Sequence, residues 1–279
     1  MEVIKKHSTK ILIGLGAAVF LFGGYYLLKP SQVQKEISTN NSSIMTNNSS
    51  RFSKGPSYNQ VINNVRSFVE KDRASGLLSK QTVMAINQSV IILFRDSYIN
   101  MIIEGRLKRR AKIDNKLEFT QILLENTKTA ENLMQAASKE VLDDLNVSMQ
   151  LYERSSDEIS KTDPQFAMIN LYMIESIKTQ IPSKRHQFVS KEELVEIMKF
   201  QLSKFKTEDF KQFNLPPQES FLVKQTYISD LASLKYMYEE EDLMRNPTIL
   251  QDPDVQNVQR EIQMHLQQEQ MSIDRKSVV

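Results

Sequence analysis

Residues 83–103 read VMAINQSVIILFRDSYINMII, and this stretch decides how the body of the chain folds. Its apolar side chains recur at helical spacing and cover most sides of a helix, which predicts a buried central helix over about residues 79–110. A membrane span is the alternative interpretation. Arg95 and Asp96 lie at its middle, however, and each costs roughly 2.5–3.5 kcal/mol on insertion into a bilayer. We therefore expect a core helix of a soluble body.

Helical periodicity continues on both sides of this stretch, and no alternating strand is flanked by hairpin-turn residues. Further helices are predicted at residues 57–74, 115–152, 164–181, 190–206, 216–238 and 253–270. The helix predicted at 115–152 is long enough to bend or break once. The fold class is therefore predicted to be all-α, with about seven helices packed as an irregular bundle.

Helix starts are marked most clearly in the second half of the chain. Asp163-Pro164 and Asp252-Pro253 each place a capping carboxylate before a proline at the first helical position. Ser190 with Glu193 forms the pattern of a capping box, and Pro216-Pro217 opens another helix. These signals fix four helix starts independently of the apolar pattern.

The N-terminal region contains an uncharged apolar run, Ile11 to Leu28, between Lys10 and Lys29. Eighteen residues at a rise of about 1.5 Å span about 27 Å, close to the thickness of a hydrocarbon core. The run predicts a single transmembrane anchor, with a cleaved secretory signal as the alternative. Gly14 and Ala18 form a small-xxx-small pair that predicts packing against another membrane helix.

The composition then divides the chain into five parts. Residues 1–10 form a basic tail, 11–28 the transmembrane anchor, and 29–55 a flexible Asn/Ser-rich linker. Residues 56–272 are predicted as an all-helical soluble domain and 273–279 as a disordered tail.

The residue content argues against an enzyme and against bound cofactors. The chain has no cysteine and only three histidines, which are far apart in sequence, so no metal-ligand spacing occurs. Phosphate-binding loops and nucleophile motifs are missing as well. Lys plus Arg is 36 against 34 acidic residues, a net charge of +2, which gives no general attraction to nucleic acid. We expect no active site and no nucleic-acid partner.

Two dense charge runs stand out from this balanced background. The candidate contact for an acidic partner or a lipid headgroup consists of Arg106, Lys108, Arg109, Arg110 and Lys112. The alternative for this basic run is favourable charge at a helix C-terminus. The acidic run at residues 239–242 is interpreted as a solvated helix face.

The arrangement of these segments resembles that of the peroxisomal biogenesis factor 3 family. The likeness lies in a short basic N-terminus, an anchor ending in GGYYLLK, a polar stalk, and a helical body with an apolar early helix at residues 78–103. The family's RVQxNIxG segment is replaced here by INMIIEGR, which keeps Gly105 and Arg106. The resemblance implies docking of membrane proteins at the peroxisome and carries over no partner-binding residue.

The sequence therefore predicts a non-enzymatic docking or assembly protein with one span in an organelle membrane. The organelle is predicted to be the peroxisome or the mitochondrion, with the helical body in the cytosol. The expected partners are the membrane and one or more proteins, recognised as a helix in an apolar groove. The alternative is a lineage-specific accessory subunit of a mitochondrial membrane complex.

Overall fold

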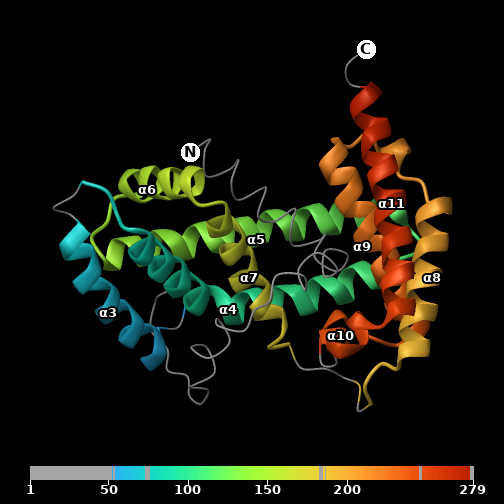
Figure 1. Cartoon of the computed structure of the whole chain (residues 1–279), viewed down its shortest axis with the longest axis horizontal. Coiled ribbons are helices and arrows are strands. Elements are labelled where there is room, and N and C mark those ends of the chain that lie inside the picture. Colours follow the sequence, from blue (N-terminus) through green and yellow to red (C-terminus); the bar gives the residue numbers. More distant parts are fainter. Residues whose placement is uncertain are drawn as a thin grey trace. The chain divides into compact units, whose positions relative to one another are not determined.

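The computed structural model describes residues 52, 54–72, 76–181, 185, 187–244 and 247–276 (Figure 1). In this part of the chain the regular structure is helical and contains no strand, which confirms the predicted all-α class. The predicted anchor at 11–28, with Gly14 and Ala18, lies outside the described residues. None of the described helices is both long enough and apolar enough to cross a membrane.

The described residues divide into two compact units, a division that the sequence pattern does not predict. Unit 1 contains residues 52–104 and 126–180, and unit 2 contains residues 105–125 and those from 181 onward. Two helices contribute to both units: α4 (Lys80–Arg110) and α5 (Lys116–Asp144). Unit 1 is completed by α3 (Pro56–Asp72), α6 (Met149–Thr162) and α7 (Pro164–Lys178).

Unit 2 is built around three helices: α8 (Lys191–Thr207), α9 (Pro217–Tyr236) and α11 (Pro253–Lys276). Helix α8 contacts both α9 and α11 (Figure 1). Short elements connect them: η1 (Lys211–Phe213), α10 (Glu240–Met244) and η2 (Pro247–Gln251). Apolar side chains from all three long helices, among them Ile197, Ile228 and Ile262, are almost completely removed from solvent. The core of this unit therefore lies between α8, α9 and α11.

The folded body begins before Pro56, so the predicted end of the linker at residue 55 is wrong. Phe52 is buried, and the ammonium of Lys54 lies 2.8 Å from Asp144 and 3.0 Å from Glu140. Tyr58 donates to the same Asp144 carboxylate at 2.7 Å. These partners are some 90 residues away in the chain, and local composition does not reveal them.

The interruption predicted within residues 115–152 is confirmed and falls at residues 145–148. Asn146 is left-handed, with φ 53°, and Val147 donates its N–H to the carbonyl of Leu142 at 2.9 Å. This is a Schellman ending with Asn in the position usually taken by Gly. Ser148 then caps α6 by accepting from the N–H of Leu151 at 3.2 Å. A new helix therefore starts here and continues to Thr162, ten residues past the predicted end.

The predicted caps are mostly confirmed. The Asp163 carboxylate accepts from Gln165 N–H at 2.9 Å, and that of Asp252 accepts from Asp254 N–H at 2.9 Å. Ser190 accepts from Glu193 N–H at 3.2 Å, whereas the Glu193 carboxylate binds Arg185. At the other end of the chain, α11 extends to Lys276, so residues 273–276 of the predicted disordered tail are helical.

Substitution of Asp144 tests whether its contacts with Lys54 and Tyr58 stabilise the beginning of the folded body. Partial burial works against ionisation, but hydrogen bonds from Lys54 and Tyr58 hold the pKa of Asp144 below its usual value. A lowered carboxyl pKa contributes stability above the unfolded pKa of about 3.9, and this contribution is lost as pH falls through the folded pKa. We expect Asp144→Asn to lower the free energy of unfolding by about 1 kcal/mol at pH 7 and to flatten its pH dependence below pH 4.

Thermal unfolding across this pH range measures the effect of Asp144→Asn. The neighbouring Asp143→Asn is the control, because Asp143 is exposed and uses its backbone carbonyl, not its carboxylate, in the helix ending. Equal effects of the two substitutions would contradict the assignment.

Candidate functional site

The basic run at the end of α4 places three guanidinium groups on one side of the helix. Arg106, Arg109 and Arg110 are separated by three and four residues, the spacing that brings side chains onto one helical face. The exposed fractions of their side chains are only 11%, 11% and 17%, respectively. Charges this deeply buried require partners, because burying an unpaired charge is very costly.

The partners are carboxylates from the same unit. Arg106 binds Glu241 with two parallel bonds of 2.9 and 2.7 Å, and Arg110 binds Glu239 in the same way at 2.6 and 2.8 Å. Asp230, on α9, accepts from Nε of both Arg109 and Arg110 at 2.9 Å. We call this group, with Glu240 3.8 Å from Arg106, the arginine–carboxylate cluster.

Electrostatics in the cluster favour the ionised state of the arginines. Burial lowers the pKa of Arg106, but the hydrogen bond to Glu241 and the charges of Glu240 and Glu239 outweigh it, so that the pKa is raised. The pKa of Arg110 is raised for the same reason, through Glu239 and Asp230. Two-bond pairing between a guanidinium and a carboxylate fixes distance and orientation together. The cluster therefore holds the end of α4 in one geometry relative to α9 and α10.

The structure thus places the five predicted contact residues in two groups. Arg106, Arg109 and Arg110 are engaged by carboxylates of the chain itself, in the arginine–carboxylate cluster. Lys108 is exposed, and Lys112, which is half exposed, lies 2.7 Å from Glu118. A contact with an external acidic partner or a lipid headgroup stays a prediction, and these two lysines are the exposed residues among the five.

The prediction that residues 239–242 form a solvated face is wrong. Glu241 and Asp242 are buried, with 3% and 2% of their surface exposed. Asp242 also accepts from Glu239 N–H at 2.7 Å, which caps the start of α10. The sequence does contain a signal for the pairing of these two runs. A dense basic run and a dense acidic run in a chain of balanced charge can neutralise each other. Asp230 gave no such signal.

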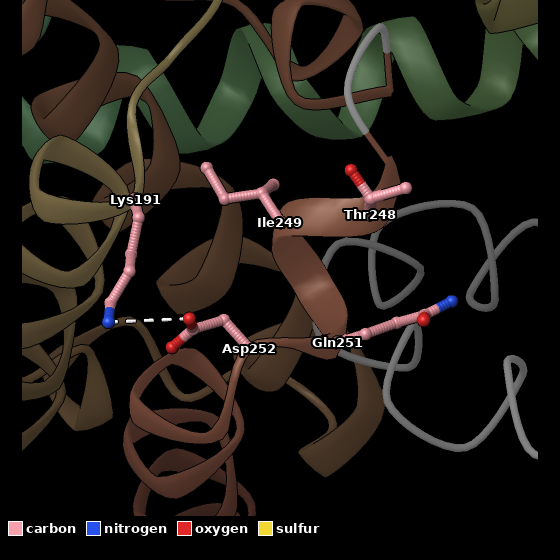
Figure 2. A pocket seen from close by; sticks show the side chains of 5 residues that line it. All are labelled: Lys191, Thr248, Ile249, Gln251 and Asp252. Atoms are coloured by element: carbon pink, nitrogen blue, oxygen red, sulfur yellow. Dashed lines mark ion pairs between the residues drawn. The ribbon is translucent and has the colours of Figure 1, made fainter.

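A second candidate site is an open surface pocket of about 390 Å³ at the starts of α8 and α11 (Figure 2). Its lining residues are Lys191, Thr248, Ile249, Gln251 and Asp252. The Lys191 ammonium lies 3.3 Å from Asp252 and 2.7 Å from Asp254. The hydrogen bond to Asp254 makes the largest contribution to raising the pKa of Lys191, and the bond to Asp252 adds to it. The positive charge of Lys191 is thus already paired within the chain, and the walls of the pocket are partly apolar through Ile249.

Within the described residues, no three His, Asp or Glu side chains come together as ligands of a metal ion would. Comparison of the chain with models of protein families, with curated proteins and with solved structures found no match.

The cluster predicts an unequal response to the loss of two neighbouring cations. Arg110→Ala leaves the buried Asp230 and the partly buried Glu239 with fewer partners, and we expect it to lower the free energy of unfolding by about 3 kcal/mol. Lys112→Ala breaks an exposed pair and should cost less than about 1 kcal/mol.

Thermal unfolding of the two variants measures this difference. Arg110→Ala combined with Glu239→Ala should cost less than the sum of the single substitutions, because the two side chains bind each other. Strictly additive effects, or equal effects of Arg110→Ala and Lys112→Ala, would show that the cluster does not support the fold.

Proposed function

We propose that the protein is a non-enzymatic docking or assembly protein, held by one N-terminal span in an organelle membrane with its helical body in the cytosol. The apolar run at residues 11–28, between Lys10 and Lys29, is the observation that carries this proposal. The family resemblance in segment order supports the peroxisome as the organelle and recruitment of membrane proteins as the task.

The surface of unit 2 supports a binding role for the body. Large apolar side chains that are more than two-fifths exposed occur on several of its elements: Leu107, Leu117, Phe188, Leu234, Met237 and Met264. Two of them, Leu234 and Met237, are close together in the chain at the end of α9, and contiguous exposed apolar groups are typical of sites of contact with proteins or membranes. The membrane anchor restricts the search to two dimensions and raises the effective concentration of anything on the same membrane.

Val19, at the middle of the run, tests the anchor. Val19→Arg places a charge at the bilayer centre at a cost of roughly 3 kcal/mol, so we expect the membrane-inserted fraction to fall about 100-fold in its equilibrium ratio. Val19→Leu preserves apolarity and is the matched control. Resistance to alkaline carbonate extraction from isolated organelles reports insertion, and an extractable unmodified chain would refute the anchor.

The organelle is tested by imaging the full chain with a C-terminal fluorescent tag against peroxisomal and mitochondrial markers. Peroxisomal signal, with the tag open to added protease, is the expected result. Mitochondrial signal would favour the alternative, an accessory subunit, which should then co-migrate with a large complex on native gels.

A further inference from the structure

We propose that the C-terminal end of α9, together with the adjoining face of α8, is a contact surface for an anionic phospholipid bilayer. We call this surface the α8–α9 patch and define it by Phe200, Leu234, Lys235, Tyr236 and Met237. It deepens the proposed function and rests on it, since the anchor at 11–28 keeps the body near the bilayer.

The aromatic part of the patch is a packed pair of rings beneath a lysine. Phe200 and Tyr236 lie edge to face, with centroids 5.7 Å apart and planes at 74°. The ammonium of Lys235 lies 4.4 Å from the centroid of Phe200 and 4.8 Å from that of Tyr236. Both rings are half-buried, whereas Lys235 is exposed. The rings thus form an amphipathic platform topped by a positive charge.

Two aliphatic side chains flank this platform at the helix end. Leu234 is 43% exposed and Met237 is 78% exposed, the largest exposed fraction among the large apolar side chains of the described residues. Together they add apolar groups that water can reach beside Lys235.

Met237 also carries a conformational cost. Its φ of 54° and ψ of 43° place it in the left-handed region, where Gly or Asn is the usual residue at a helix end. A Met side chain there adds strain, and its exposure means that it returns little packing energy to the fold. The turn requires the backbone conformation but not this side chain, so the apolar group of Met237 is available for an external contact.

The charge around the patch favours an anionic surface. No carboxylate of the described residues pairs with Lys235, and Lys199 and Lys206 are exposed on α8. The α8 neighbours also include Lys204, bound to Glu208, and Glu196, which accepts from Tyr236 Oη at 3.2 Å. Helix α8 carries four lysines and three glutamates, and together with Lys235 and the Glu208 bound to Lys204 these groups sum to a charge of +1. Each lysine near an anionic membrane adds attraction through the surface potential.

The composition and size of the patch favour a bilayer over a protein. Tyrosine, lysine and aliphatic groups together are typical of segments that sit at the lipid headgroup level. A stable protein interface uses about 20–30 residues a side, far more than the five of this patch. A few residues suffice for a body that is already tethered, because the anchor supplies the effective concentration.

The chain has no cysteine, so single cysteines carrying an environment-sensitive fluorophore can report on chosen positions of the full protein. The full chain is reconstituted into vesicles of phosphatidylcholine with phosphatidylserine, or of phosphatidylcholine alone, that contain brominated lipids as quenchers. Ala18→Cys reports the anchor, Met237→Cys the patch, and Met264→Cys, half exposed on α11, is the matched control.

We expect quenching at residue 18 in both vesicles, quenching at residue 237 that depends on phosphatidylserine, and an aqueous signal at residue 264. Quenching at 18 with an aqueous signal at 237 overturns the lipid contact and leaves the anchor intact. An aqueous signal at 18 refutes the anchor, and with it the tether on which the patch depends. Equal quenching at 237 and 264 would show non-specific adsorption and also overturns the proposal.

Substitutions then separate charge from apolar contact, with a fluorophore at Leu234→Cys as the reporter. Lys235→Glu should lower the contact equilibrium at least fivefold, and Met237→Gly about tenfold, whereas Met264→Ala should leave it unchanged. Met237→Gly should not destabilise the fold, because glycine suits the left-handed position. Unchanged quenching in both Lys235→Glu and Met237→Gly would overturn the lipid contact at this patch.

Discussion

The pairing of Arg106, Arg109 and Arg110 with carboxylates of unit 2 is the constraint on which the geometry of this unit depends. Bringing three cations and their partners out of water costs several kcal/mol per ion, and good geometry is needed to recover it. Both two-bond pairs satisfy this requirement, with N–O distances between 2.6 and 2.9 Å. Such pairs fix the orientation of the elements more than they add net stability. Apolar side chains in their place could keep the stability but would not form directional bonds.

The connection between α9 and α10 places the acidic segment next to the arginines. Helix α9 ends at Tyr236, Met237 turns the chain through a left-handed conformation, and Tyr238 is buried at once, with Gln201 donating to its hydroxyl at 3.2 Å. Residues 239–241 follow directly and meet the arginines. Burial, with the nearby charge of Glu240, also raises the pKa of Tyr238, so its hydroxyl stays neutral and able to hydrogen-bond. The buried tyrosine and the left-handed residue therefore position the acidic segment.

The sequence predicts the local features of this fold well and the distant pairings poorly. Caps at Asp163, Ser190 and Asp252 depend on residues two or three positions away, so the pattern that predicts them is contained in the sequence window. The arginine–carboxylate cluster joins residues more than 110 positions apart, and Lys54 meets Asp144 across 90. A charged run looks the same in sequence whether it faces water or an opposite run. This is why residues 239–242 were predicted as a solvated face.

Met237 has two separate roles to account for, one for its backbone and one for its side chain. The backbone is needed for the fold, whereas the side chain is not. The turn into Tyr238 needs a positive φ, which glycine supplies at the least steric cost and asparagine at a small one. Either would bring the acidic segment to the arginines equally well. An exposed methionine, beside a lysine that caps two aromatic rings, adds an apolar and cationic surface that contributes nothing to the cluster. The end of α9 is thus the turn that completes unit 2, and in the lipid contact that we propose the same residues meet the headgroup layer.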